Sequence, residues 1–264
     1  MPCFPEIRQC PCEPKSKVRI ARRLQAVECT TKVVLLCLES GEPRWVELGD
    51  TRGIANATVT LGLALADEGD FSRARELFEE SVRLCRDAGD EDNALFASRL
   101  LAWMHEELGD RERAWTLYEH NLGWARALGN KPLESQTLGA VASMALDQGR
   151  AGDAVSLLKD VLRIDRDLGA RLQTSLDLTR FARALAFAGG EDTEAAKLLS
   201  CAEAAREEMG AGGMPYLVRN HEEALAIIRT RLDDDVFAEA WQAGAKLTVD
   251  EAVALALGET ELDA

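Results

Sequence analysis

The side chains best suited to metal binding or catalysis in this sequence are its three histidines and seven cysteines. Two of the histidines precede pairs of glutamates, in the segments His105-Glu-Glu and His221-Glu-Glu. A helical zinc site needs a second histidine one turn further along the helix, and neither segment has one. We therefore expect no metal site there, and we interpret His105 as a half-buried helix residue.

Five of the cysteines fall within the first 37 residues, and two of these form the segment Cys10-Pro-Cys12. This spacing fits neither a zinc knuckle nor a redox pair, and no histidine lies near it. The sequence has no secretory signal either, so a framework of disulfides is not expected. Free thiols are the simplest interpretation, with Cys85 and Cys201 as small core residues.

Motifs of nucleotide binding and catalysis are absent from the sequence. It contains no Gly-x4-Gly-Lys-Ser/Thr loop and no Gly-x-Ser-x-Gly elbow. Paired carboxylates are frequent, but chance pairs are expected among 46 acidic residues, so we assign no general acid. The sequence thus predicts a protein that is not an enzyme and that needs no cofactor and no metal.

The composition is that of an acidic protein built from helices. Ala, Leu, Glu and Arg are abundant, whereas aromatic residues make up only 5%. The net charge of −15 disfavours binding to the phosphates of nucleic acids. No apolar stretch reaches the length of about 18 residues that a membrane span requires. We expect no membrane insertion and a cytoplasmic location.

The elements that would position a binding site follow from a repeat with a period of forty residues. One series of glycines marks this period: Gly49, Gly89, Gly129 and Gly169. A second series lies midway between them: Gly69, Gly109, Gly149 and Gly189. Glycine is favoured where a helix ends in a left-handed residue, so each unit is predicted to be helix, turn, helix, turn.

Apolar residues within these units recur at helical spacing. In the first unit they form one stripe: Ala74, Leu77, Phe78, Val82 and Cys85. Such a stripe is typical of an amphipathic helix with a broad buried face. A single pair of helices cannot bury its apolar faces fully, so successive pairs are expected to stack into an all-α solenoid.

Several of these residues stand at the spacing of a known repeat. Leu61-Gly62, Gly69-Asp70, Ala74 and Phe78 resemble the signature of a tetratricopeptide repeat, and the three later units carry comparable residues. The resemblance implies a right-handed solenoid of helical hairpins with a forty-residue repeat. Four repeats are expected, at residues 49–88, 89–128, 129–168 and 169–210.

Two segments resemble one particular group of proteins that contain tetratricopeptide repeats. The turn at residues 48–55 resembles the turns between long tetratricopeptide repeats in bacterial ATP-dependent regulators of the LuxR class. The Phe-Ala-x-Ala-Trp segment that ends at Trp241 is similar to the end of the same repeat region. Residues 211–264 are therefore expected to form a helical cap, in which Phe237 and Trp241 close the end of the solenoid. Thr248 and Glu251 form a capping box that begins the last helix.

Residues 1–48 do not follow the repeat. They hold five of the seven prolines and most of the cysteines. A helix over residues 17–38 is possible and would cover the first repeat. Arg19, Arg22 and Arg23 form a small basic group, which we interpret as a solvated helix face.

The resemblance also implies a binding groove, because the first helix of each tetratricopeptide repeat lines the concave side of the array. The corresponding positions in this sequence are Asn56, Val59, Leu63, Asp67, Phe96, Arg99, Trp103, Glu107, Gln136, Gly139, Ser143, Asp147, Thr179, Arg183 and Phe187. Six of them are the candidate binding residues: Asn56, Arg99, Trp103, Gln136, Ser143 and Arg183.

The candidate residues suggest different contacts with a ligand. The amides of Asn56 and Gln136 could hold a peptide backbone. Arg99 and Arg183 could anchor the carboxylates of an acidic ligand. Trp103 lies one turn from Arg99, a combination common in binding hot spots. The alternative is that Trp103 packs between helices and that Arg99 pairs with a neighbouring glutamate.

These features favour a non-enzymatic module that binds a protein or peptide segment. By resemblance it would be the sensor region of an ATP-dependent transcriptional regulator. The ATPase and the helix-turn-helix of such regulators are not in this sequence, so it would be a stand-alone relative or a fragment. The alternative is a helical-repeat domain that senses a small molecule. The sequence gives no preference for a monomer or an oligomer.

Overall fold

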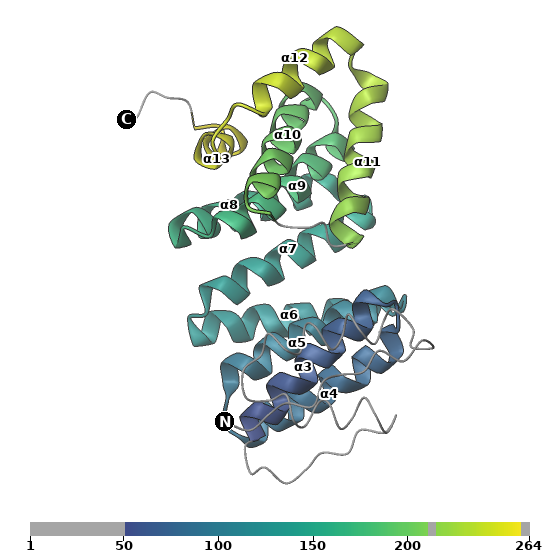
Figure 1. Ribbon diagram of the computed structural model, residues 1–264, viewed down its shortest axis with the longest axis vertical. Coiled ribbons are helices and arrows are strands. Elements are labelled where there is room, and N and C mark those ends of the chain that lie inside the picture. The colour runs from purple at the N-terminus through teal and green to yellow at the C-terminus, as the bar shows by residue number, and fades with distance from the viewer. Residues whose placement is uncertain (1–50, 211–214, 260–264) are drawn as a thin grey trace, which may run out of the picture. The chain divides into compact units, whose positions relative to one another are not determined.

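The computed structural model describes residues 51–210 and 215–259, in which all regular structure is α-helical (Figure 1). Eleven helices follow one another in these ranges, and no strand is present in them. The all-α fold of helical repeats predicted from the sequence is therefore confirmed. The turn expected at Gly49 and the helix expected over residues 17–38 lie outside the described residues.

The chain divides into two compact units, with the division between Ala114 and Trp115. The helices of the first unit are α3 (Thr51–Asp67), α4 (Phe71–Asp87) and α5 (Glu91–Glu107). Helix α6 (Arg111–Leu128) contains the division. The later helices are α7 (Lys131–Asp147), α8 (Ala151–Leu168), α9 (Arg171–Ala188), α10 (Asp192–Glu208), α11 (Pro215–Arg231), α12 (Asp234–Gly244) and α13 (Val249–Leu257).

The turn between α3 and α4 shows how the glycine series ends the helices. Gly69 has a φ of 83°, a left-handed conformation that side chains other than glycine rarely adopt. Its amide donates to the carbonyl of Ala66 at 3.0 Å. Asp70 follows and accepts from the backbone N–H of Arg73 at 3.3 Å, which caps the first turn of α4. The predicted glycine turns are thus present throughout the described repeats.

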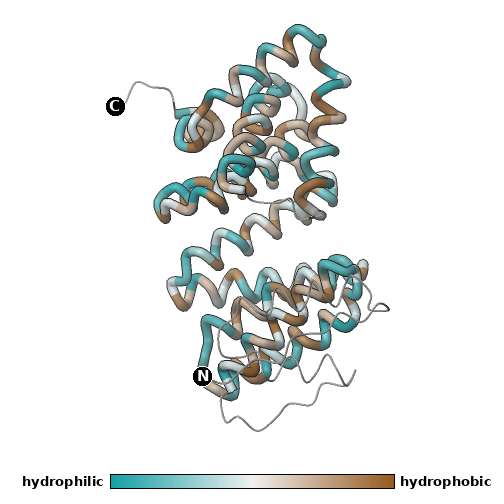
Figure 2. Tube along the Cα trace, in the orientation of Figure 1, coloured by the Kyte–Doolittle hydropathy of each residue, from teal (hydrophilic) through white to brown (hydrophobic). Residues whose placement is uncertain are grey.

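The core of the first unit forms where α3 and α4 approach closely. The ring of Phe78 is fully buried, and a Cβ atom added at Gly62 would lie only 2.6 Å from a ring carbon. The Leu-Gly pair in α3 therefore has a packing reason, since any larger residue would displace the ring. Apolar and polar residues alternate along the amphipathic helices around this contact (Figure 2).

In the second unit, the C-terminal helices pack against the preceding ones. A Cβ added at Gly244 would lie 2.2 Å from the carbonyl oxygen of Lys197, so α12 and α10 touch through their backbones. The rings of Phe237 and Trp241 stack with centroids 5.4 Å apart, and both pack against the main apolar core. The predicted capping box is present, because Thr248 and Glu251 cap each other's backbone at the start of α13.

The contact between Gly62 and Phe78 gives a stability prediction. Gly62→Ala should lower the free energy of unfolding by about 1–3 kcal/mol, because the new methyl group overpacks a closed core. Urea unfolding of the full chain, followed by far-ultraviolet circular dichroism, measures this.

The matched control is Gly123→Ala, since Gly123 is also helical and has no atom within 4 Å of an added Cβ. This control should be neutral or stabilising by up to about 1 kcal/mol, because alanine restricts the unfolded chain. Equal effects of the two substitutions would contradict the close approach of α3 and α4.

Candidate binding site

The first unit contains a pocket of about 360 Å³ between its three helices. The pocket is lined by residues of α3, α4 and α5: Asn56, Val59, Thr60, Leu63, Ser81, Cys85, Asn93 and Phe96. Asn56 is one of the six candidate binding residues predicted from the sequence. Val59, Leu63 and Phe96 also belong to the predicted concave positions, so the pocket lies on the first helices of two successive repeats.

The inner wall of this pocket is uncharged. Ser81 is fully buried, and its hydroxyl donates to the backbone carbonyl of Ala55 at 3.2 Å. Burial raises the pKa of the Cys85 thiol, which therefore stays protonated at neutral pH. Because Val59, Leu63 and Phe96 complete the walls, the pocket offers apolar surface with a few polar groups.

Asn93 lies at the start of α5 and is tied to the residue that caps this helix. Its side-chain nitrogen donates to Asp90 Oδ2 at 2.9 Å, and its backbone N–H donates to Asp90 Oδ1 at 3.3 Å. The guanidinium of Arg52, at the start of α3, lies 3.3 Å from the same Oδ2. These contacts hold the Asn93 amide in place beside the pocket. Asn93 was not among the candidates predicted from the sequence. Its position three residues after Asp90, a residue type that often caps helices, could have indicated that it lies at the start of a helix.

Arg99 and Trp103 are not among the residues that line the pocket, and both have contacts of their own. The guanidinium of Arg99 lies 5.5 Å from the centroid of the Phe96 ring, which is a pocket wall. Trp103 is partly buried against the apolar core of the first unit, and its indole N–H donates to Glu107 Oε1 at 3.0 Å. Trp103 is therefore partly packed within the unit.

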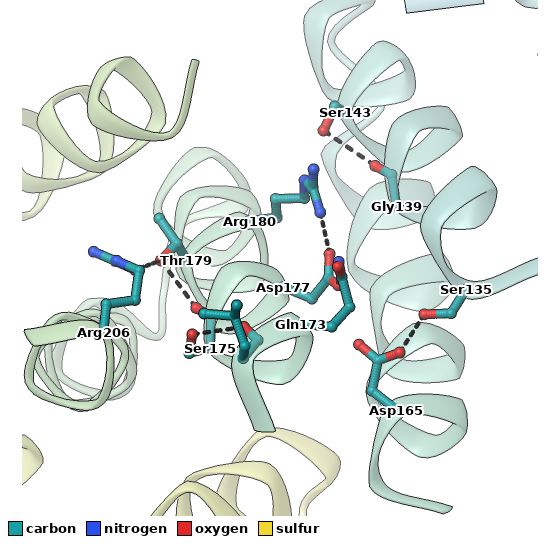
Figure 3. A network of polar contacts seen from close by, with 11 residues as sticks. Ser135, Gly139, Ser143, Asp165, Gln173, Ser175, Asp177, Thr179, Arg180 and Arg206 are labelled. Atoms are coloured by element: carbon teal, nitrogen blue, oxygen red, sulfur yellow. Dashed lines mark hydrogen bonds and ion pairs between the residues drawn. The ribbon is translucent and has the colours of Figure 1, made fainter. Parts of the chain in front are cut away.

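The candidate residues of the second unit differ in their surroundings. Gln136 and Ser143 are half-buried on α7, and the Ser143 hydroxyl donates to the carbonyl of Gly139 in its own helix at 3.1 Å (Figure 3). Thr179, one of the expected concave positions, is fully buried instead and accepts from Arg206 at 2.6 Å. Thr179 is therefore part of the interior.

Arg183 is held by the chain's own carboxylates. Its Nη2 lies 3.0 Å from Asp147 Oδ1 on α7, and its Nε donates to Glu223 Oε2 on α11 at 2.8 Å. The guanidinium also lies 5.2 Å from the centroid of the Phe187 ring. With only 8% of its surface exposed, Arg183 joins three helices. This placement departs from the hypothesis that Arg183 is an anchor for the carboxylates of a ligand.

The comparison with known families agrees with this geometry. Residues 53–122 match the family model described as tetratricopeptide repeat. The match includes all of the residues that line the pocket. No curated protein matches the chain.

Tetratricopeptide repeats generally mediate protein–protein interactions and are typically non-enzymatic scaffolds. In the described part of the chain, no cluster of three or more His, Cys, Asp or Glu residues is placed to hold a metal ion. None of the described helices is both long enough and apolar enough to cross a membrane.

A buried polar network in the second unit was not foreseen from the tetratricopeptide pattern (Figure 3). The Ser135 hydroxyl of α7 donates to Asp165 Oδ1 of α8. Asp177 of α9 pairs with Arg180 and accepts from Gln173 at 2.6 Å. Asp165 is 1% exposed, and its Oδ2 has no hydrogen-bond partner among the described residues. A usable signal was that Asp165 occupies the stripe position that Cys85 and Ala125 occupy in the preceding repeats.

The environment of Asp165 favours the protonated form of its carboxyl group at neutral pH. Burial, together with the nearby charge of Asp177, raises the pKa of Asp165 to about 8. The burial and the neighbouring charge both disfavour the ionised form of Asp165, whereas Asp177 has Arg180 as an ion-pair partner.

The first prediction from this site concerns Arg183. Arg183→Met should lower the free energy of unfolding by about 1–3 kcal/mol, because two partly shielded carboxylates lose their cation. Arg163→Met is the matched control, since Arg163 pairs with Asp160 on the exposed face of α8. The control should change stability by less than about 0.5 kcal/mol. Similar thermal melts for the two variants would mean that Arg183 does not join the helices.

The second prediction concerns pH. The folded pKa of Asp165, about 8, lies above the value of an exposed aspartate. The resulting stabilisation is complete below the unfolded pKa of about 3.9 and is lost as pH rises through the folded pKa. Unfolding free energy should therefore fall with pH between these values, by up to about 1.4 kcal/mol per unit.

Asp165→Asn should flatten this slope and raise stability at pH 8, whereas Asp160→Asn, an exposed change on the same helix, should leave the slope unchanged. Urea titrations at several pH values measure both. An unaltered slope in Asp165→Asn would show that the proton is held elsewhere.

Proposed function

We propose that this chain is a non-enzymatic binding module that holds a segment of a partner protein or peptide in the pocket of its first unit. The observation that carries the proposal is the uncharged pocket between α3, α4 and α5, within the residues that match the tetratricopeptide model. Apolar walls supply binding free energy, and the amides at the pocket edge can pair with a peptide backbone.

The candidate residues have different parts in this proposal. Asn56 is exposed and lines the pocket, so it is proposed to contact the partner directly. Arg99 and Trp103 are proposed to support the Phe96 wall, on which Arg99 lies. Gln136 and Ser143 belong to the second unit, where they are proposed as secondary contacts for a longer partner.

A finer part of the proposal concerns the kind of protein. The resemblance of residues 48–55 and of the segment ending at Trp241 to ATP-dependent regulators of the LuxR class supports a sensor role. In that role, occupation of the pocket would be the signal that a regulator receives. This part depends on the sequence resemblance, whereas the binding role depends on the pocket.

A second candidate function is the sensing of a small molecule. The observation that favours it is the pocket volume of about 360 Å³, which lies in the range typical of small-ligand sites. The pocket is open between three helices rather than buried in the core, and the repeat family generally binds proteins. For these reasons the peptide is the preferred ligand.

A display library of random twelve-residue peptides, panned against the immobilised full chain, tests the binding role. Peptides that bind should lose affinity for Val59→Arg by at least about tenfold, because the substitution places an unpaired cation in an apolar pocket. Val236→Arg is the matched control, since Val236 is 41% exposed on α12 and lies outside the pocket. Unchanged circular dichroism confirms that both variants fold.

Two results would contradict the proposal. One is that the library yields no peptide that binds. The other is that selected peptides bind Val59→Arg as tightly as the unaltered chain.

A further inference from the structure

The second unit contains a histidine whose surroundings favour its neutral form. His221 of α11 is half-buried, and its Nδ1 has no hydrogen-bond partner among the described residues. Its ring packs against the Trp241 ring of α12 in a T-shaped arrangement, with the centroids 6.2 Å apart. A protonated imidazole carries a hydrogen on both nitrogens, so the buried Nδ1 would become a donor. An added proton would therefore place a charge and an unsatisfied donor at the contact between two helices.

The charged groups around His221 come from two helices. Glu203 and Arg206 belong to α10, which packs against α11, and Glu222 belongs to α11 itself. Burial is the main cause that lowers the pKa of His221, and the charge of Arg206 adds to it, whereas Glu203 and Glu222 oppose it. The helices α9 and α12 also pack against α11, but none of their charged side chains in the described ranges shifts this pKa.

Arg206 brings a second cation into the same region. Only 9% of its surface is exposed, and its Nη1 donates to Thr179 Oγ1 of α9 at 2.6 Å. Because this hydroxyl is neutral, the positive charge of Arg206 remains and would repel a charged imidazole. The neutral form of His221 is thus the one that fits between α10 and α12.

The packing of α12 on α10 depends on the residue that His221 contacts (Figure 1). The Ser200 hydroxyl of α10 donates to the backbone carbonyl of Trp241 at 2.8 Å. After the end of α12, the carbonyl of Leu247 accepts from the thiol of Cys201 at 3.4 Å. Cys201 is only 1% exposed, so its thiol becomes accessible when this segment leaves α10.

We propose that His221 makes the packing of α12 on α10 sensitive to acid. When the imidazole takes up a proton, its contact with Trp241 weakens, and α12 separates from α10 while the first unit stays folded. A proton drives this change and no ligand is needed. The inference therefore goes beyond the proposed function and does not depend on the pocket of the first unit.

The direction of the pH effect follows from the preference for the neutral form. Because the fold lowers the pKa of His221, the folded state binds this proton less readily than the unfolded state. The stabilisation is complete above the unfolded pKa of about 6.5 and is lost as pH falls through the folded pKa. Asp165 has the opposite effect, since its raised pKa makes the fold more stable in acid. A global unfolding experiment mixes the two effects, so the test needs a local probe.

Cys201 supplies the local probe, and Cys85 of the first unit is the reference, because both thiols are free and buried. The full chain is treated at about pH 7.5 and about pH 5, on either side of the ordinary pKa of histidine, with dithiodipyridine, a disulfide that labels thiols in acid. Mass spectrometry quantifies the two labelled peptides. Each rate is divided by the rate in urea at the same pH, which removes the effect of pH on thiol reactivity. The ratio of Cys201 to Cys85 labelling should rise severalfold in acid.

Variants show whether His221 is responsible. His221→Gln cannot take up the proton, so the rise in the ratio should disappear. His120→Gln is the matched control, because the exposed His120 also meets a tryptophan ring, that of Trp124, with centroids 5.8 Å apart. This control should keep the full rise. Glu203→Gln removes a carboxylate that stabilises the charged imidazole in the packed arrangement, so its rise should exceed that of the unaltered chain.

Several results would overturn the inference. One is a ratio that does not change with pH in the unaltered chain, and another is a rise that persists in His221→Gln. Equal acceleration of Cys85 and Cys201 would show that acid loosens the whole chain. Circular dichroism at neutral pH checks that each variant folds. Should His221→Gln fail to fold, Glu203→Gln decides, and a rise no larger than that of the unaltered chain would reject the role of His221.

Discussion

The structure depends on how closely the two helices of each repeat can approach. In the first unit the fully buried ring of Phe78 lies against Gly62, with no room for a methyl group. The later repeats place small residues at the position of Gly62, namely Ala102, Ala142 and Ala182, all with no exposed surface. In each repeat, a large residue on the second helix thus packs against a small residue on the first helix. This contact allows the two helices to lie close together, and the pairs then stack on one another.

The first helix of each repeat has another face, which does not contact the second helix of the same repeat. The residues on this face have different surroundings in the two units. In the first unit, Asn56, Val59 and Leu63 line an open pocket. In the second unit, Arg183 draws Asp147 and Glu223 together, so that face is held by ion pairs within the chain. The same repeat position can therefore line an open pocket in one unit and hold helices together in another, and the residue present decides which.

The sequence predicts local features well and distant pairings poorly. The glycine turns, the capping box at Thr248 and the packing of Phe237 on Trp241 all follow from residues a few positions apart, and all are present. Asn56, which lines the pocket, could be selected because a repeat signature carries positions from one unit to another. The partners of Arg183 lie 36 and 40 residues away, and nothing in a single repeat says which of many carboxylates will reach it.

The buried acids were missed for a related reason. Asp165 lies on the buried stripe of its helix, at a position where the periodicity predicts a small apolar residue. The periodicity of one helix does not show that this aspartate interacts with a second aspartate on another helix. Its partner Asp177 comes from the next helix, and both become intelligible only when Ser135 of a third helix is seen beside Asp165. Polar groups in a core are satisfied by geometry across helices, which local sequence patterns do not contain.

The buried network around Asp177 and the polar contacts of Asn93 differ in whether a ligand could reach them. The network around Asp177 is closed: a Cβ added at Gly139 would lie 3.0 Å from its Oδ1, so the backbone of α7 already occupies the space a ligand would need. Its printed contacts all lie within the chain, and they help to fix how α7, α8 and α9 fit together. Asn93 has the opposite arrangement. Asp90 accepts from its amide nitrogen, and Asn93 itself lines a pocket with uncharged walls. An open pocket with apolar walls and a few polar groups can take a ligand, and for this reason the binding role is proposed for the first unit.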